Sequence, residues 1–510
     1  MFPKLSKNLI RESFAHVLES PRPQMRTLDL AVLAAYLVGI TWFGAQFRGS
    51  QKTLKDYFLG GRDTPWWAIA FSIVSAETST LTVIGTPGIA FAGNLGFLQV
   101  VFGYLIARVV ISTLFLPLYF KGEMFTAYEL MQRRFGHNIR KLTAGSFLVL
   151  RAMAEGVRVF AISIVITIIL GTGEIPSIML IVFLTLFYTF EGGMTAVIWT
   201  DVVQMFLYVA GAIISLFVIL NHIPGGFAHV WESASAANKF RIFDFRFELT
   251  AEFFARPYSF WAGILGGTFL TTASHGTEQL MVQRLLAAGS ERDSRKALFA
   301  SWIVILFQFT LFLMIGIILW VYYQDNHLAP PAKLDRVYPQ FIWNSLPTPI
   351  AGLVMAAILA AAMSNLSAAL NALASTTIMD FFKPYSKKFR TEEQYVRLAR
   401  WTTVAWGCVL FAIALIAQNI KSVLESGLSI ASIVYGSLLG VFLLGRLTTR
   451  VGEKAAMVGM LCGLVLMLYI YGNTKIAFTW YVLIGTTVTM STALLASLVI
   501  KEDNIVRTEA

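Results

Sequence analysis

Charged residues are scarce in this 510-residue chain, and their scarcity excludes most soluble folds. Only 14% of the residues are Asp, Glu, Lys or Arg, whereas 56% are apolar, which is unlike a soluble multidomain protein. The two cysteines, Cys408 and Cys462, lie in apolar stretches and indicate neither a disulfide framework nor a metal site. The chain also lacks an HExxH motif, a phosphate-binding glycine loop and a visible nucleophile–base set. These absences predict a membrane protein that is not an enzyme.

The N-terminus is not a secretory signal, because residues 1–26 carry charges throughout and have no continuous apolar core. We predict an amphipathic segment over residues 1–27. Thirteen apolar segments follow, each close to the length of about 20 residues that a membrane span needs. They cover residues 28–46, 66–90, 95–119, 142–171, 177–191, 195–220, 257–285, 297–323, 348–381, 400–419, 424–445, 455–472 and 476–500. More than half of the 40 Lys and Arg fall in the loops on one side. The positive-inside rule then places the N-terminus outside the cell and the tail 501–510 in the cytoplasm, for a protein of the plasma membrane.

The second span contains the most informative stretch, FSIVSAETSTLTVIGTPG over residues 71–88. Glu77 stands in its middle among serines and threonines, although a carboxylate at the bilayer centre costs about 2.5–3.5 kcal/mol on insertion scales. Glycine and proline follow and loosen the helix, which a bilayer tolerates only beside protein or a water-filled cavity. A broken, acidic span is typical of the ion and solute site of a secondary transporter.

A second interrupted span covers residues 261–284, with four glycines and a polar run at 271–279. It lies five spans after the first, and such a pair at corresponding positions indicates an inverted repeat. We therefore expect two halves of five spans each, 66–220 and 257–445. One additional span, 28–46, precedes them, and two more, within 455–500, follow them. The alternative is two independent helices with glycine packing faces.

A third polar group interrupts the alanine-rich span at residues 356–380, where Ser364, Asn365 and Ser367 occur together. Sodium is a hard cation that prefers oxygen ligands, which hydroxyl groups and released backbone carbonyls supply. The same side chains also serve as hydrogen-bonding contacts between helices. From the residues alone, the two interpretations have equal weight.

Several motifs together resemble the sodium:solute symporter family, which includes the sodium/glucose and sodium/proline cotransporters. The motifs are YFLGGRDTPWW (57–67), RRFG (133–136), GGMTAVIWTDVVQ (192–204), EQLMVQRLLAA (278–288) and SNLSAALNALASTTIMD (364–380). The resemblance implies an all-α fold of leucine-transporter type with a five-plus-five inverted repeat. It also implies sodium-coupled symport of a small polar organic solute by alternating access, by a protein that functions as a monomer.

The resemblance also implies a sodium site between the first broken helix and the span at 348–381. Its matching ligands are the carbonyls of Ser75, Thr78 and Ala361 and the side chains of Ser364 and Asn365. Asn365 departs from the family's usual hydroxyl residue. Asp201 and Ser367 match positions that hold a further sodium in some members, but Ala368 lacks the hydroxyl group of that site. Asp201 then serves in the inner gate, and Glu77 either attracts sodium or hydrogen-bonds across the break.

The signals for the solute conflict. HGTEQLMVQR resembles the sugar and polyol branch, whereas GTPG resembles the proline branch. We favour a sugar or polyol, and leave open an amino acid such as proline, a monocarboxylate, or coupling to protons through a carboxylate. The candidate solute-binding residues are Glu77, Thr82, Gln99, His275, Glu278, Gln279 and Ser429.

Four charged residues inside spans have no role in the resemblance: Arg108, Arg151, Glu155 and Arg158. Arg151 and Glu155 are four residues apart, on one helical face, so we expect them to pair. A structural network is the favoured interpretation for all four.

Overall fold

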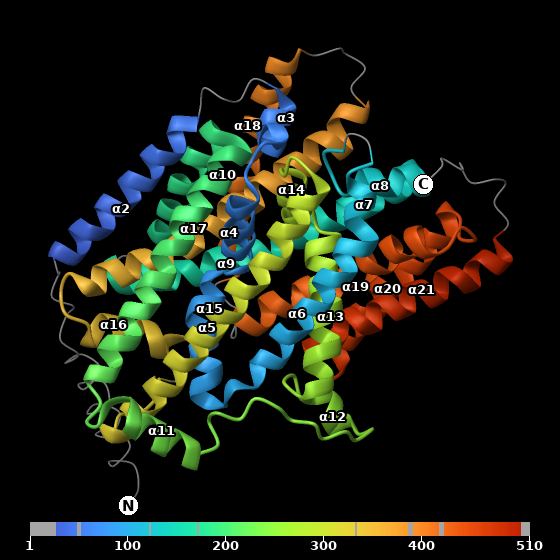
Figure 1. Cartoon of the computed structure of the whole chain (residues 1–510). Helices are drawn as coiled ribbons and strands as arrows, with labels where there is room; N and C mark the ends of the chain where they lie inside the picture. Colours follow the sequence, from blue (N-terminus) through green and yellow to red (C-terminus); the bar gives the residue numbers. More distant parts are fainter. Residues whose placement is uncertain are drawn as a thin grey trace, which may run out of the picture.

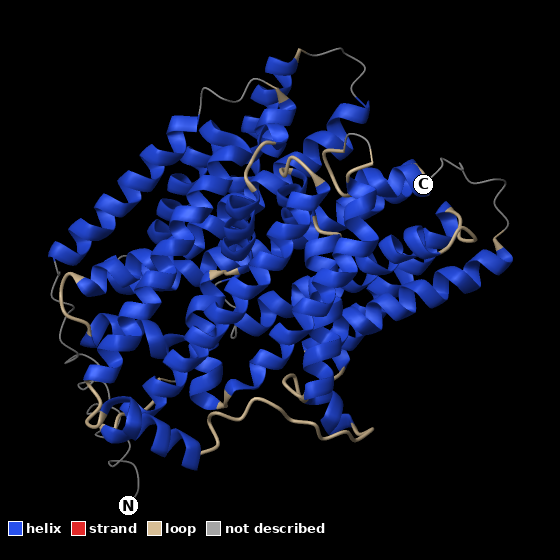
Figure 2. Cartoon of the chain, viewed as in Figure 1, coloured by secondary structure: helices blue, strands red, loops and turns tan. Residues whose placement is uncertain are grey.

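The computed structural model describes residues 27–47, 53–121, 124–170, 173–331, 334–385, 391–417 and 423–500. Within these ranges the chain is built from helices and loops and contains no strand (Figure 2), so the all-α prediction is confirmed. The predicted amphipathic segment before residue 27 and the tail 501–510 lie outside the described residues.

Helices follow one another along the whole chain (Figure 1). The first half comprises α2 (Thr27–Ala45), α3 (Leu54–Leu59), α4 (Trp66–Glu77), α5 (Thr80–Ala92), α6 (Leu98–Val110), α7 (Leu116–Tyr119), α8 (Tyr128–Arg134), α9 (His137–Leu170), α10 (Glu174–Asn221) and α11 (Gly226–Ala236). The second half comprises α12 (Ala251–Ala255), α13 (Phe260–Gly276), α14 (Gln279–Leu286), α15 (Glu291–Asp325), α16 (Val337–Ser345), α17 (Ile350–Thr376), α18 (Glu392–Ala417), α19 (Val423–Leu447), α20 (Glu453–Asn473) and α21 (Tyr481–Val499). A π-helical turn at Ile111–Phe115 joins α6 to α7, and another, Thr377–Phe382, extends α17.

Among the described residues, nine helices are long and apolar enough to cross a membrane, or ten when α4 and α5 are counted as one bent span. Three of the thirteen predicted spans are not in this set. They are α9, whose middle carries three charged residues, the 17-residue α13, and the first part of α10. Helix length and composition therefore establish a multi-span protein without establishing thirteen spans.

The predicted loop between the spans 177–191 and 195–220 is wrong, because helix α10 is continuous over 48 residues. Its two apolar parts are Ile175–Phe187 and Met194–Asn221. The backbone stays helical through Glu191, Gly192 and Gly193, where the hydropathy pattern suggests a loop.

Both predicted interruptions are present. Helix α4 ends at Glu77 and α5 begins at Thr80, with a bend of 63° between them. Helix α13 ends at Gly276 and α14 begins at Gln279. Each break therefore consists of two residues in extended or irregular conformation within the membrane-embedded part of the chain.

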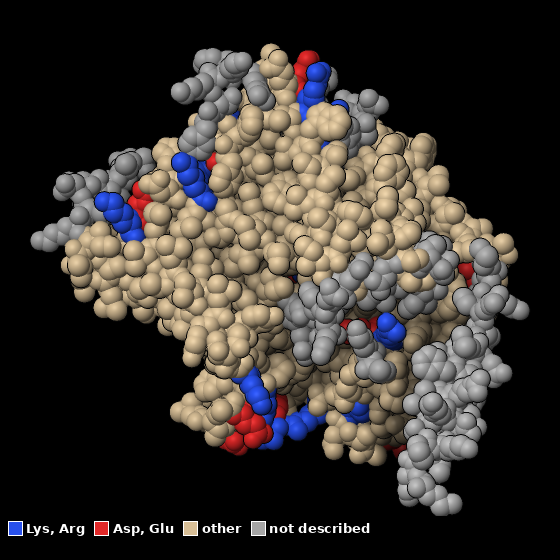
Figure 3. All heavy atoms as spheres, turned by 180° about the vertical axis from the view of Figure 1, so that it is seen from behind, with Lys and Arg blue, Asp and Glu red and all other residues tan. Residues whose placement is uncertain are grey.

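Helix α17 forms the centre of the molecule, since 94% of its most apolar stretch is buried, against 22% for α2 and 28% for α21. The outer helices expose apolar side chains instead, as expected of surfaces that face lipid. On the face drawn in Figure 3, Lys, Arg, Asp and Glu gather mainly near the upper edge and in the lower third. The belt between them is mostly uncharged, which suits a bilayer.

Outer helices also fix the ends of two inner helices. The Asp29 carboxylate of α2 accepts a hydrogen bond from the Gly352 N–H at the start of α17, at 2.7 Å. The Glu453 carboxylate of α20 accepts from the Asn138 and Ile139 N–H groups at the start of α9, at 2.6 and 3.1 Å. Carboxylates satisfy the free N–H groups at a helix start. The two helices that carry the central polar residues are thereby anchored from outside.

An extended segment between α11 and α12 covers the lower end of the molecule in Figure 1. Asp244 pairs there with Arg246 at 2.6 Å and with Arg241 at 3.0 Å. These guanidinium groups, chiefly that of Arg246, lower the pKa of Asp244 to about 2. The Asp244 N–H donates to the Gln99 side chain at 3.1 Å, so the segment is fixed to the helical body.

Candidate sodium and solute site

The first break releases backbone carbonyl groups from the helical ladder. In a continuous helix the Ser79 N–H would bond to the Ser75 carbonyl, but here it donates to Thr82 Oγ1 at 3.3 Å. Likewise, the Thr82 N–H donates to the Ser79 carbonyl at 2.8 Å instead of the Thr78 carbonyl. The break thus frees the carbonyls of Ser75 and Thr78 from these helical bonds, the same two that the sequence predicts as sodium ligands.

Helix α17 faces this break through Ser364. Its hydroxyl group lies 2.6 Å from that of Ser75 and donates to Asp201 Oδ1 at 2.7 Å. Ser367 lies one turn further along and donates to the Ser364 carbonyl at 2.9 Å. The third predicted carbonyl ligand, Ala361, lies within the same buried helix. Of the predicted sodium ligands, Ser75 of α4 and Ser364 of α17 are therefore direct neighbours.

Asp201 of α10 belongs to a closed, fully buried network on this side of the break. Its Oδ2 accepts from Arg284 Nη2 at 2.8 Å and from the Ser72 hydroxyl at 2.6 Å. Arg284 also donates through Nε to Ser72 and through Nη1 to the Leu280 carbonyl. All three nitrogens of this guanidinium group are therefore used, and its charge is balanced by Asp201.

Glu77 lies between the two broken helices. Its Oε2 is 3.2 Å from Arg108 Nη2 of α6 and accepts from His275 Nε2 of α13 at 3.1 Å. Arg108 also donates to the carbonyls of Leu298 and Tyr104, at 3.1 and 3.2 Å, so its three nitrogens are all engaged. The Glu77 carboxylate therefore neutralises the buried Arg108. It also links the first break to α13, the helix that precedes the second break.

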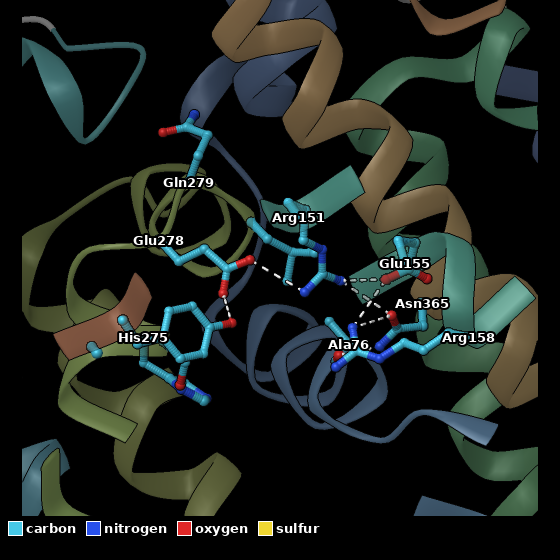
Figure 4. A network of polar contacts seen from close by, with 12 residues as sticks. Ala76, Arg151, Glu155, Arg158, His275, Glu278, Gln279 and Asn365 are labelled. Carbon is cyan, nitrogen blue, oxygen red and sulfur yellow. Dashed lines mark hydrogen bonds and ion pairs between the residues drawn. The ribbon is translucent and has the colours of Figure 1, made fainter. Parts of the chain in front are cut away.

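A second cluster of charges surrounds Asn365 (Figure 4). Arg151 Nη2 lies 2.9 Å from Glu155 Oε2 and Arg158 Nη1 lies 3.0 Å from the same oxygen; the expected pair of Arg151 and Glu155 is confirmed. Both arginines also donate to Asn365 Oδ1, at 3.2 and 3.4 Å. On its other side, Arg151 Nη1 lies 3.2 Å from Glu278 Oε1 in the second break. Two arginines of α9, of which Arg151 is buried, thus meet one amide oxygen and two carboxylates.

The network extends to α19 and back to the first break. The Tyr435 hydroxyl donates to Glu278 Oε2, and Asn365 Nδ2 donates to the Ala76 carbonyl at 2.6 Å. Asn365 therefore uses its amide nitrogen on the first broken helix and points its oxygen toward two guanidinium groups. An oxygen in that position is a poor ligand for a cation, so Asn365 is the least supported member of the predicted sodium site.

Some buried atoms of this second cluster have no partner within the described part of the chain. They are the Nε atoms of Arg151 and Arg158 and one carboxylate oxygen of Glu155. Buried donors and acceptors of this kind are costly unless they are satisfied. They indicate where a further hydrogen-bonding group would be accepted.

Other predicted solute-binding residues are placed differently. Gln279 points away from the cluster in Figure 4 and bonds to the backbone of Phe125 and Ala127. Gln99 uses its whole amide group on backbone atoms of Gly96, Tyr258 and Asp244, the last of which belongs to the extended segment between α11 and α12. Thr82 caps α5, and Ser429 is buried on α19. Of the predicted set, the structure brings Glu77, His275 and Glu278 closest to the two breaks.

Sequence reasoning missed three residues that hold these networks together. Arg284 neutralises Asp201, Tyr435 holds Glu278, and Gln308 of α15 donates to Thr78 Oγ1 at 2.6 Å. Arg284 was detectable, because an arginine within an apolar span needs a partner. Gln308 and Tyr435 are ordinary in a membrane helix, so no signal distinguishes them.

Comparison with known proteins places the chain in a family. The model of the "Sodium:solute symporter family" matches residues 57–463. A sodium/sialic acid symporter of Proteus mirabilis is 27% identical over 467 residues, which cover 90% of this chain and 92% of the relative. A sodium-coupled monocarboxylate transporter of Xenopus laevis is 27% identical over 455 residues, which cover 86% of this chain and 70% of the relative.

A solved structure of a Na+-coupled sialic acid symporter, described as substrate-bound and outward-open with a novel Na+ site, has the same fold. Its TM-score to this chain is 0.85 at 26% identity, and the match covers 94% of this chain and 99% of that one. None of these relatives is named as a carrier of a neutral sugar or polyol, so that prediction gains no support. The chain belongs to the sodium:solute symporter family and is a multi-pass, sodium-coupled solute symporter, from a family of transporters and not of enzymes.

Proposed function

We propose that this chain imports a small organic acid together with sodium by alternating access, with the solute carboxylate held by Arg151 and Arg158. The proposal replaces the neutral sugar or polyol that the sequence favoured. Sodium moves down its gradient and is transported with the solute.

The observation that carries the proposal is the incomplete use of these two arginines. Arg151 is buried, the side chain of Arg158 is 14% exposed, and the Nε atom of each has no partner among the described residues. The planar guanidinium group matches a carboxylate with two parallel N–H donors. A carboxylate is a charged acceptor for these unused N–H donors, whereas a neutral sugar offers only uncharged acceptors.

The names of the relatives point the same way. Sialic acid and monocarboxylates both carry a carboxylate at neutral pH, and their symporters are among the relatives that align with most of this chain. A polyhydroxylated acid would also use neutral polar groups, of which the chain has several near the breaks. We therefore favour a sugar acid or a short monocarboxylate over an amino acid.

For sodium, we propose ligands from the carbonyls of Ser75, Thr78 and Ala361 and from the Ser364 hydroxyl. The released carbonyls and the short distance between Ser75 and Ser364 support this set. Asn365 stays a secondary candidate because its oxygen faces the arginines. Asp201 is proposed as part of the inner gate, since Arg284 already balances its charge.

We also propose the finer architecture. Residues 66–220 and 257–445 form the two inverted repeats of five spans, with the two apolar parts of α10 as the last two spans of the first repeat. Helix α2 precedes the repeats, and α20 and α21 follow, which makes thirteen spans. The lysines and arginines of the alternate loops support a cytoplasmic C-terminus and an external N-terminus, in the plasma membrane.

Uptake by the purified protein in proteoliposomes tests the function. An inward sodium gradient is imposed and sialic acid, propionate, proline and glucose are compared as labelled solutes. We expect sodium-dependent uptake of at least one of the two acids and none of glucose. Transport of glucose or proline without transport of either acid would contradict the proposed substrate class, and uptake driven by a pH gradient alone would contradict sodium coupling.

A further inference from the structure

Glu278 occupies an unusual position for a residue of a solute site, because its carboxylate already holds the arginine that the solute needs. We propose that Glu278 is an internal counter-ion, which neutralises Arg151 until the carboxylate of the solute replaces it. This inference rests on the proposed function of the same site and adds a mechanism by which binding is coupled to the second break.

The contacts of Glu278 divide between two fixed helices. One oxygen lies 3.2 Å from Arg151 Nη1 on α9, and the other accepts from the Tyr435 hydroxyl on α19. The side chain is only 3% exposed. Its backbone is extended and immediately precedes the first residue of α14. Rotation of this short break therefore moves the carboxylate relative to both partners.

Arg151 has two carboxylate partners that differ in their freedom to leave. Glu155 lies one turn along the same helix and holds both Arg151 and Arg158 at (i, i+4) and (i, i+3) spacing. No motion between helices separates these three residues. Glu278 comes from another element, so it is the partner that can be exchanged without deforming α9.

The hydrogen bonds of Arg108 differ from those of Arg151. All of the nitrogens of Arg108 are engaged, and two of them donate to backbone carbonyl groups. Arg151 donates to side chains only, and its Nε is unused within the described part of the chain. The guanidinium group of Arg151 therefore has an unused donor for a new carboxylate within the described part of the chain, and all three nitrogens of Arg108 are engaged.

The charges of the cluster give the exchange its coupling to sodium. Arg151 and Arg158 balance Glu155 and Glu278, so the cluster is neutral before any solute binds. A solute carboxylate adds one negative charge, which is expensive in a buried site unless a positive charge accompanies it. Sodium at the adjacent first break supplies that charge, so each ligand favours binding of the other.

Replacing Glu278 by glutamine tests the inference, because the amide keeps the shape and removes the competing charge. Binding of sialic acid and of propionate to the purified protein is measured by calorimetry with and without sodium. In Glu278→Gln we expect at least one acid to bind about tenfold more tightly than in the wild type, which corresponds to about 1.4 kcal/mol, and to depend less on sodium. Unchanged or weaker binding in a folded variant would overturn the inference.

Two further variants keep the result interpretable. Glu278→Asp retains the charge but is one methylene too short to reach both Arg151 and Tyr435, so we expect a smaller gain of a few-fold. Glu291→Gln makes the same chemical change in an exposed ion pair on α15 and should leave binding unchanged. If the wild type binds neither acid, the proposed function fails; if it binds an acid and Glu278→Gln gives no gain, only the role of Glu278 fails.

Discussion

The two charged networks beside the breaks contain the same kinds of residues and are used differently. Around Asp201, every nitrogen of Arg284 has a partner, and the hydroxyl groups of Ser72 and Ser364 complete the network. Around Asn365, the Nε atoms of two arginines have no partner among the residues that the structure describes. The first network has the completeness of a structural or gating element, whereas the second has capacity for a ligand. Completeness of hydrogen bonding therefore separates the two roles better than charge or burial does.

The largest expected effect concerns the network around Asp201, in which every nitrogen of Arg284 has a partner. Asp201→Asn leaves Arg284 buried without its counter-charge, and breaking such a pair costs about 3–5 kcal/mol. We expect a clear fall in the unfolding temperature in detergent. The double variant Asp201→Asn with Arg284→Gln should recover most of that loss. If Asp201→Asn were as stable as the wild type, the ion pair of Asp201 and Arg284 would not have the structural role assigned to it.

The next largest effect concerns the cluster of charges around Asn365. Arg151→Lys keeps the charge but loses the planar pair of donors. We expect binding of the transported acid to weaken by about tenfold to a hundredfold, which is about 1.4–2.7 kcal/mol, with a smaller effect on the unfolding temperature. Calorimetric titration beside a melting curve measures both quantities. A large loss of stability with unchanged affinity would reverse the assignment of the two networks.

A third prediction addresses the residue that joins the complete network to the proposed sodium site. Ser364→Ala removes one oxygen ligand and one hydrogen bond to Asp201. We expect the apparent affinity for sodium in uptake assays to fall about tenfold and stability to fall by about 1 kcal/mol. Ser367→Ala, one turn away, is the matched control and should affect sodium less. Equal sodium dependence in wild type and Ser364→Ala would remove this residue from the site.

The smallest effect comes from an exposed pair of the same types. Asp244 and its arginines lie in the extended segment between α11 and α12. Because both arginine side chains are exposed, solvent screens these ion pairs and they contribute little to stability. The Asp244 pKa of about 2 lies below the ordinary value of 3.8. The stabilisation is therefore present above about pH 4 and is lost as the pH falls toward 2. Melting curves of Asp244→Asn should differ slightly from wild type at pH 7 and not at pH 2; a difference that persists at pH 2 would contradict this account.

Hydropathy and local patterns predicted the helices and both breaks, because these depend on segments that are close in sequence. The pair of Arg151 and Glu155 was predictable for the same reason. The partners of Arg108 and Asp201 were not, since Glu77 and Arg284 lie on other helices and their meeting depends on packing. The continuous helix α10 escaped prediction because hydropathy falls between its two apolar parts while the backbone stays helical. Charged residues inside spans indicated the region of the site, but they did not reveal which of these residues have all of their hydrogen-bonding atoms paired.

The neutrality of these networks has an electrical consequence. Membrane voltage performs work of about 2.3 kcal/mol per elementary charge per 100 mV, and it acts on net charge that moves. Because Glu77, Asp201, Glu155 and Glu278 are matched by four arginines, the rearranging ion pairs contribute little current of their own. The net charge moved in one transport cycle then equals the number of sodium ions minus the number of negative charges on the solute. One sodium with one monovalent acid would be electrically silent, so any voltage dependence of uptake would report each additional sodium ion directly.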